Sequence, residues 1–474
     1  MQKSSNALKA GIGYTLSNIL IKGINFLALP LFSRLLTTEE FGLYNVFVSY
    51  ESILYVIVGL AIHSSIRSAN LDFKNKIDEY VSSVSLIYII NSFLLIFVGF
   101  VLKGPIYSLL QLTPLTVLLI VIYSFSTALI TLYNNKISLY YEYKKYIIIS
   151  FVNSVGSILL SLILILTLFN DKKEIGRLLG VTITCFSLSG YILYSFYKTK
   201  RPKYNKIYWR YAIKYSLPIV PHGISQVLLA QFDRIMIQQI NGNTQAGIYS
   251  FAGNFKLILT IITDSIGTAW STWFYERIDK KEYSRICKSA MSLCLLFLAI
   301  SISLMTISPE LIYLLGGEKY KEAIYVTIPM IIDAFVLFVY TVIVPSEYYA
   351  KKTKYIMVGT IIAAIINIIT NYIFIRAYGY IAAAYTTLFA YLCYLFLHVA
   401  ISKRLISFYI ISIKWIIIFL TMIAVAGIIT IHFAEMIIVR FILGLIIVAP
   451  IVVLLIIKNK ELVHKVVSRI KSSN

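Results

Sequence analysis

Long apolar stretches recur throughout this 474-residue sequence and restrict what it can fold into. A helix needs about 20 mainly apolar residues to cross the hydrocarbon layer of a bilayer. Because a backbone in lipid must satisfy its own hydrogen bonds, stretches of this length favour helices. We therefore predict an all-α integral membrane protein with about 14 transmembrane helices. The predicted spans are 11–34, 43–66, 81–102, 115–135, 147–168, 176–197, 215–240, 247–275, 289–308, 323–345, 355–375, 381–401, 415–433 and 436–457.

The composition agrees with lipid as the main solvent. Hydrophobic residues make up 59% of the chain and charged residues 14%, against about 25% charged residues in a typical soluble domain. A formal net charge of +22 is one sign of nucleic-acid binding. If Met1 is cytoplasmic, however, most of the 43 Lys and Arg residues fall in cytoplasmic loops and the tail, as the positive-inside rule predicts. We therefore expect a multi-pass membrane protein with both termini cytoplasmic and no nucleic-acid partner.

The sequence lacks the usual motifs of enzyme chemistry. It has no G-x-x-x-x-G-K-[ST], H-E-x-x-H or G-x-S-x-G pattern, and no group of His, Cys and carboxylate residues has metal-ligand spacing. The four cysteines lie in or beside apolar segments, which predicts free packing thiols. We therefore expect no enzyme activity, no cofactor and no metal.

Similar turns occur in two halves of the sequence. Gly-Leu-Tyr at 42–44 follows the first predicted span, and Gly-Ile-Tyr at 247–249 follows the seventh, 205 residues later. The longest loop, 198–214, separates the first six predicted spans from the next six. An even number of spans per repeat gives both halves the same orientation in the membrane. The predicted domains are an N-terminal six-helix lobe at 1–200, a pseudo-repeated C-terminal six-helix lobe at 201–410, and two extra helices with a basic cytoplasmic tail at 411–474.

Charged and amide side chains interrupt the first predicted span. A charge at the bilayer centre costs at least ~2.5–3.5 kcal/mol, so it usually faces a water-filled cavity or a partner. Lys22 lies near the middle of this span, with Asn18 and Asn25 on the same helical face. We predict that these three residues line a functional cavity. The natural partner of Lys22 is an anion, either Glu51 of the second span or a substrate phosphate.

The seventh and eighth predicted spans carry further candidates. Gln226 and Asp233 share one stripe of the seventh span, Arg234 lies beside it, and the eighth span contains Lys256 and Asp264. A structural ion pair is the alternative role for Asp233 and Arg234. The candidates for substrate binding or cavity lining here are Gln226, Arg234 and Lys256. The candidates for binding a coupling ion are Glu51, Asp233 and Asp264.

Other polar residues in the spans favour structural roles. Asn367 and Asn371 lie one turn apart in the eleventh span, and such amides often only hydrogen-bond a neighbouring helix. We favour that role over substrate binding. His222 lies near the cytoplasmic end of the seventh span, where an interfacial position is its simplest interpretation.

Four stretches stand in a distinctive order and spacing. They are LFSRLLTTEEFGLY at 31–44, YSLPIVP at 215–221 followed by Asp233-Arg234, AGIYS at 246–250, and NIITNY at 367–372 followed by YGYIAAA at 378–384. Together with the six-plus-six-plus-two arrangement, they resemble the polysaccharide exporter branch of the multidrug/oligosaccharidyl-lipid/polysaccharide (MOP) flippase superfamily. This branch includes the flippases of O-antigen and capsule repeat units.

The resemblance implies two six-helix lobes around a central cavity that works by alternating access. It implies a membrane-lipid substrate, an undecaprenyl-pyrophosphate-linked oligosaccharide, and a polysaccharide polymerase machinery as a partner. A cationic cavity suits a pyrophosphate, which makes Lys22, Arg234 and Lys256 the candidates for holding it. The three carboxylates named above would balance this charge or bind a coupling H⁺ or Na⁺.

Three other functions stay open. A drug or metabolite antiporter of the same superfamily would favour carboxylates in its cavity, whereas here cations offset them. A flippase for the peptidoglycan lipid precursor also fits fourteen spans. A membrane enzyme such as a glycan polymerase usually needs a large external loop, and no predicted external loop here is large enough to fold on its own.

Overall fold

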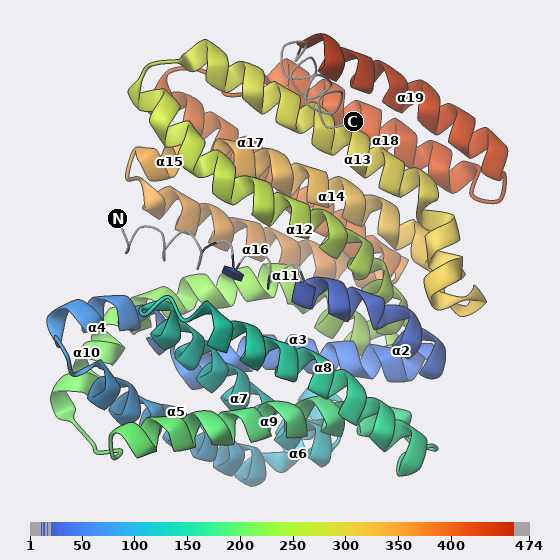
Figure 1. The fold of residues 1–474 in the computed structure, drawn as a ribbon. Coiled ribbons are helices and arrows are strands. Elements are labelled where there is room, and N and C mark those ends of the chain that lie inside the picture. Colours follow the sequence, from blue (N-terminus) through green and yellow to red (C-terminus); the bar gives the residue numbers. More distant parts are fainter. Residues whose placement is uncertain (1–10, 12, 15–16, 18–19, 459–474) are drawn as a thin grey trace, which may run out of the picture. The chain divides into compact units, whose positions relative to one another are not determined.

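The computed structural model describes residues 11, 13–14, 17 and 20–458, and the regular elements in this part of the chain are all helical (Figure 1). Twelve of these helices are long and apolar enough to cross a membrane. They correspond to the second to sixth and the eighth to fourteenth predicted spans, which confirms the all-α membrane fold. They are α3 (Thr38–Gly59), α5 (Ile77–Val101), α7 (Pro114–Ser138), α8 (Tyr143–Thr167), α9 (Lys173–Thr199), α12 (Asn243–Asp279), α13 (Tyr283–Gly316), α14 (Ile324–Ile343), α16 (Thr353–Tyr378), α17 (Ile381–Ile406), α18 (Ile413–His432) and α19 (Ile437–Lys458).

The other two predicted spans are the first and the seventh, so a count of fourteen stays a prediction. The first lies partly outside the described residues; from residue 20 it is helical, and it ends in α2 (Leu29–Leu35). The seventh is α11 (Val220–Asn241), which a short 3₁₀ turn at Leu217–Ile219 precedes. The polar residues of α11 lower its hydropathy, and it is not among the twelve helices apolar enough to span.

The second predicted span begins earlier than expected because its start is capped. The Thr37 hydroxyl accepts a hydrogen bond from the Glu40 amide at 3.1 Å, and the Glu40 carboxylate accepts one from the Thr37 amide at 2.7 Å. This reciprocal capping box satisfies two of the amides that a helix start leaves without partners. It fixes the start of α3 at Thr38 rather than at residue 43.

The same span also ends earlier, which corrects the prediction of one helix through residue 66. Leu60 and Ala61 both have left-handed backbones, with φ of 46° and 51°. Two such residues in succession stop an α-helix, since this conformation is unfavourable for side chains with a Cβ. The chain continues as a 3₁₀ turn, Ile62–Ser65, and a short helix, α4 (Ile66–Asp72).

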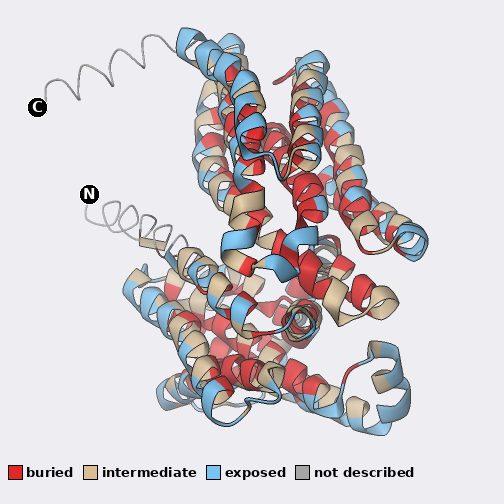
Figure 2. Cartoon of the chain, turned by 90° about the vertical axis from the view of Figure 1, so that its right-hand side faces the viewer, coloured by how far each residue is buried: buried red, intermediate tan, exposed pale blue. Residues whose placement is uncertain are grey.

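Contacts divide the chain into two compact units, Met1–Gly247 and Ile248–Asn474. In the first unit, α9 packs against α8, α7 and α3, while α3 also packs against α7 and α11 (Figure 1). Its core includes fully buried Ile62, Tyr80 and Leu129. Figure 2 shows that helix sides facing neighbours of the same unit are buried, while many outward sides are exposed. The division at 200 and 410 by sequence repeat stays a prediction.

In the second unit, α17 lies between α14 and α16, and α13 packs against α14, α18 and α19. Arg440 ties the last described helix to α13. Its side chain is fully buried, donates to the Thr306 carbonyl at 2.8 Å, and forms an ion pair with Glu310. A buried arginine of this kind is tolerated because its donors are satisfied by carbonyl and carboxylate oxygens.

Two glycines allow the starts of α3 and α12 to touch backbone to backbone. A Cβ on Gly42 would lie 1.8 Å from the Asn243 carbonyl oxygen, and a Cβ on Gly247 would lie 2.0 Å from that of Thr38. No side chain fits at such distances. The two contacts are reciprocal, because Asn243 and Gly247 follow Thr38 and Gly42 at the same offset of 205 residues.

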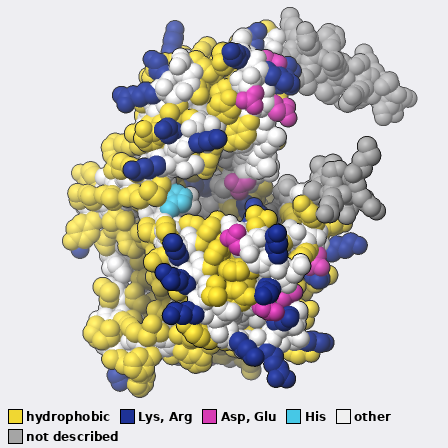
Figure 3. All heavy atoms as spheres, turned by 90° about the vertical axis from the view of Figure 1, so that its left-hand side faces the viewer, with side chains coloured by type: hydrophobic (Ala, Val, Ile, Leu, Met, Phe, Trp, Pro, Cys, Tyr) yellow, Lys and Arg dark blue, Asp and Glu magenta, His cyan; other side chains and the backbone are white. Residues whose placement is uncertain are grey.

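Figure 3 shows more Lys and Arg than Asp and Glu side chains on the face that it draws. The first unit also contains α10 (Lys206–Ser216), and the second unit contains α15 (Pro345–Tyr349). The basic loops are the ones that the positive-inside rule predicts to be cytoplasmic. Both chain termini lie outside the described residues.

Candidate functional site

Of the three residues predicted in the first span, the structure describes Lys22 and Asn25, and Asn18 lies outside the described residues. Lys22 is half-buried. The Asn25 side-chain oxygen accepts a hydrogen bond from Ser154 of α8 at 2.7 Å. Asn25 therefore connects its helix to α8, a structural role beside the predicted cavity role.

Glu51 lies in the packing of α3 against α7, with 6% of its surface exposed. Its neighbours include Thr127 of α7, and its backbone carbonyl accepts a hydrogen bond from Ser124 at 3.4 Å. One carboxylate oxygen is buried without a hydrogen-bond partner among the described residues. A buried carboxylate with spare hydrogen-bonding capacity suits proton or cation binding.

Gln226 of α11 lines a cavity of about 220 Å³ inside the first unit. Its other polar neighbours there are His222, Tyr55, Tyr88 and His63, and the lining contains no Lys, Arg, Asp or Glu. Burial lowers the pKa of His63, which lies beyond the end of α3, and so favours its neutral imidazole. The polar groups of this cavity are therefore those of amide, phenol and imidazole side chains.

Asp233 and Arg234 take up different environments on α11. Asp233 is buried, whereas Arg234 is half-buried and donates a hydrogen bond to Gln231 one turn earlier. Asp233 and Arg234 thus give α11, which packs against α3 in the first unit, one buried and one half-buried charged residue.

Lys256 has a partner that the sequence analysis did not assign to it. Its ammonium lies 2.9 Å from the carboxylate of Asp333 on α14, and 4.8 Å from the ring centre of Tyr391. Asp333 is almost fully buried, at 1% exposure of its side chain, while that of Lys256 is 22% exposed. Asp264, one of the ion-coupling candidates, lies on an exposed side of α12.

Asn367 and Asn371 bridge α16 to α17, as favoured from the sequence. Asn367 donates to the Thr387 hydroxyl at 2.9 Å, and Asn371 accepts a hydrogen bond from Thr386. Both amides are fully buried. Sequence spacing showed that they share a helical face, and the structure adds the two threonines that complete the bridge.

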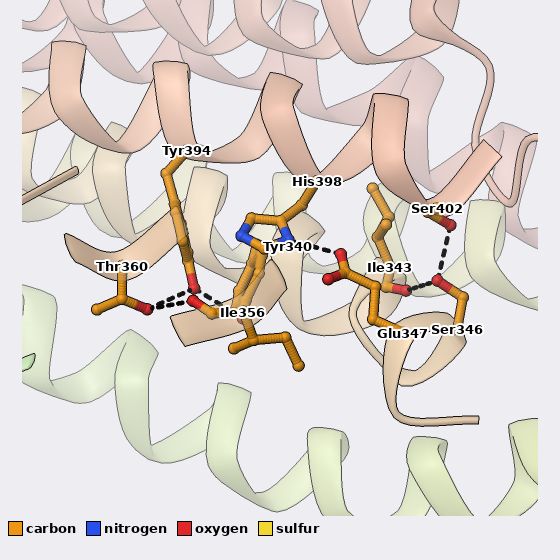
Figure 4. A network of polar contacts seen from close by, with 9 residues as sticks. All are labelled: Tyr340, Ile343, Ser346, Glu347, Ile356, Thr360, Tyr394, His398 and Ser402. Atoms are coloured by element: carbon orange, nitrogen blue, oxygen red, sulfur yellow. Dashed lines mark hydrogen bonds and ion pairs between the residues drawn. The ribbon is translucent and has the colours of Figure 1, made fainter. Parts of the chain in front are cut away.

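The structure also brings together two residues that the sequence analysis missed, Glu347 and His398 (Figure 4). Both side chains are 0% exposed, and His398 Nδ1 lies 2.5 Å from Glu347 Oε1. Each residue lies close to the end of a predicted span, where polar groups are common and attract no attention. A search for ionisable residues near both ends of the spans would have marked them.

The profile of the family described as "Polysaccharide biosynthesis protein" matches residues 7–276, more than half of the chain. The chain belongs to this family. A second profile, MatE, matches residues 218–373. The Lsg locus putative protein 1 of Haemophilus influenzae is 24% identical over 375 residues, which cover 76% of this chain and 89% of that protein.

Two solved structures share the fold. The lipid II flippase MurJ in an inward closed conformation matches with a TM-score of 0.74 and 15% identity, over 95% of this chain and 100% of that one. An inward-facing multidrug resistance MATE family transporter of the MOP superfamily matches with a TM-score of 0.62 and 12% identity, over 83% and 98%. The family and the fold together make this protein a multi-pass membrane transporter of the MOP superfamily, as the sequence resemblance implied.

Proposed function

We propose that this protein flips undecaprenyl-pyrophosphate-linked oligosaccharide repeat units across the bacterial plasma membrane by alternating access, for export of a capsule, an O-antigen or a similar surface polysaccharide. The observation that carries the proposal is the polysaccharide biosynthesis family match, which covers 7–276. The transporter fold supports a translocation step rather than a step of glycan synthesis. Both termini are proposed to be cytoplasmic.

The polar residues of the first unit suit the two parts of such a substrate. Lys22 and Arg234 are proposed to attract the pyrophosphate, since charge-assisted hydrogen bonds to phosphate oxygens are strong. The cavity beside Gln226, with its tyrosines and histidines, suits the hydroxyl groups and ring faces of a sugar. Lys256 is less available for an anion because Asp333 already compensates its charge.

The carboxylates retain their proposed part in the cycle. Glu51, Asp233 and Asp264 are candidates for binding a coupling H⁺ or Na⁺, and the burial of Glu51 and Asp233 makes these two the stronger ones. A unit charge that crosses 100 mV contributes about 2.3 kcal/mol. Coupling to one such ion would drive substrate release on the outer side, where a polymerase machinery is the proposed partner.

The test is deletion of the gene in its host, with measurement of surface polysaccharide and of lipid-linked repeat units in the membrane. We expect surface glycan to be lost while repeat units accumulate on the cytoplasmic side. Wild type should restore export and Lys22→Ala should not, despite normal membrane insertion. Lys74→Ala, which alters an exposed lysine of a turn, is the matched control and should restore export fully.

Other outcomes would point to the alternatives. Normal surface glycan with increased sensitivity to cationic drugs would contradict the proposal and favour an antiporter. Cell lysis with accumulation of the peptidoglycan lipid precursor would favour a precursor flippase instead.

A further inference from the structure

The buried pair of Glu347 and His398 lies within the second unit, where α15 packs against α17. Glu347 belongs to the five-residue helix α15, which begins at Pro345 just after α14 ends. His398 belongs to α17, and α16 closes the site from another side. A Cβ on Gly359 of α16 would lie 2.5 Å from His398 Nε2, so only glycine leaves room for the ring.

The groups around the pair carry no charge that would compensate that of Glu347 or His398. The titratable side chains that face it are Tyr340 of α14 and Tyr394 of α17, with Tyr348 of α15 further out. Tyrosines stay neutral over the range in which His and Glu titrate. From α16 the neighbours are Gly359 and the hydroxyl of Thr360.

Lysine side chains of the nearby turn do not alter this balance. Lys352 contacts Glu347 only through its backbone amide, which donates to the Glu347 carbonyl at 3.0 Å, and its side chain is exposed. No ion pair between either buried residue and a Lys or Arg occurs in the described part of the chain.

Charge balance then requires one proton at this site. A neutral imidazole beside an ionised carboxylate would bury a net negative charge, which is strongly unfavourable in a dry interior. One added proton makes the pair neutral overall, whether it resides on the ring or on the carboxyl group. One proton therefore balances the charge of the pair while both side chains are buried.

We propose that Glu347 and His398 form a proton-binding site whose loading and emptying accompany transport. The inference rests on the proposed function and names its coupling ion as H⁺. Na⁺ fits the site poorly, because hard cations prefer several oxygen ligands and the pair offers one carboxylate and one imidazole nitrogen. Since Glu347 lies on a short helix beyond Pro345, a shift of α15 away from α17 would expose both groups together.

The first test measures protonation directly and needs no substrate. The full chain, purified in detergent with ¹⁵N-labelled histidine, contains five His residues, and His398→Gln identifies the signal of His398. We expect this signal to stay protonated as the pH is raised through the range in which an ordinary histidine titrates, and Glu347→Gln to convert it to a neutral ring. An unchanged His398 signal in Glu347→Gln, or titration like that of an exposed histidine, would overturn the inference.

The second test links the site to transport. Proteoliposomes would carry the repeat units that accumulate in the deletion strain, and an imposed pH gradient should accelerate their translocation by wild type. In Glu347→Gln and His398→Gln this acceleration should fall at least about fivefold, the lower end of typical coupling between sites. Size-exclusion chromatography of the purified variants in detergent would check that they are folded.

A matched control separates proton binding from helix packing. Ser346 donates a hydrogen bond to Ser402 at 2.7 Å, joining the same two helices without a titratable group (Figure 4). Ser402→Ala should keep the full acceleration, and an equal loss in this variant would overturn the inference. If wild type translocates no repeat units, the proposed substrate is wrong, while the histidine measurement still decides whether the pair binds a proton.

Discussion

At the scale of single residues, charges in the apolar helices are matched by specific partners. Lys256 lies against Asp333, and Arg440 lies against Glu310. The sequence marked Lys256 as a charge that needs a partner, but it could not identify Asp333. The two residues are far apart in the chain, and only the packing of α12 and α14 brings them together. Glu347 and His398 were missed because each lies close to the end of a predicted span.

Loss of Asp333 should destabilise the protein strongly. Asp333→Ala leaves the Lys256 ammonium partly buried without its carboxylate, so we expect the free energy of unfolding to fall by about 3–5 kcal/mol. The measurement is denaturant unfolding of the purified protein in detergent. Asp264→Asn, on the exposed side of α12, should change it by less than about 0.5 kcal/mol.

The double variant Lys256→Met, Asp333→Leu tests the cause of this effect. Because apolar replacement of both partners removes the unpaired charge, it should recover most of the lost stability. If the double variant is as unstable as Asp333→Ala, the loss of stability does not come from the unpaired charge of Lys256.

At the scale of helices, hydropathy located the spans well but placed their ends less well. Twelve predicted spans match apolar helices, since length and hydrophobicity alone determine which segments can cross lipid. The ends depend on local chemistry. The capping box of Thr37 and Glu40 is visible in the sequence and could have fixed the start of α3. The left-handed Leu60 and Ala61 carry no such signal, because neither residue type favours that conformation.

The close contact between the starts of α3 and α12 predicts that replacing Gly42 by a larger residue lowers stability. Gly42→Ala would place a methyl group where the Asn243 carbonyl lies, so the helix starts must separate. We expect a loss of about 1–3 kcal/mol in the free energy of unfolding, the usual range for overpacking. Thermal and denaturant unfolding of the purified protein would measure it.

Gly99→Ala provides the control for this substitution. Gly99 lies in α5, and a Cβ there would meet nothing within 4 Å. This variant should be neutral or stabilised by up to about 1 kcal/mol, because alanine favours a helix more than glycine does. An equal change in the free energy of unfolding for Gly42→Ala and Gly99→Ala would show that the starts of α3 and α12 do not touch in this way.

At the scale of the whole molecule, composition and charge distribution predicted the class of protein and its orientation. The fold class followed from the number of apolar stretches, and the family from four short motifs in order. The environments of the functional candidates did not follow, because helix packing decides which polar faces meet. The substrate-binding role predicted for Lys22 and Gln226 stays a prediction, whereas the residues that line the cavity around Gln226 required the structure.

The orientation can be tested with single cysteines in a variant whose four native cysteines are replaced. Glu318→Cys, at an exposed site in the turn before α14, should react with a membrane-impermeant maleimide added to intact cells or spheroplasts. Lys280→Cys, in the turn after α12, should react only after permeabilisation, because the positive-inside rule places it in the cytoplasm. The reverse pattern would invert the predicted topology.

The reciprocal contact of Gly42 and Gly247 also bears on how such a chain arose. Gly42 touches Asn243, and Gly247 touches Thr38, which corresponds to Asn243 at the 205-residue offset. The contact is therefore self-complementary, like the isologous interface of a two-fold symmetric dimer. A self-complementary contact at an offset of 205 residues is what two copies of one ancestral segment would make. Gene duplication and fusion would keep such a contact inside a single polypeptide.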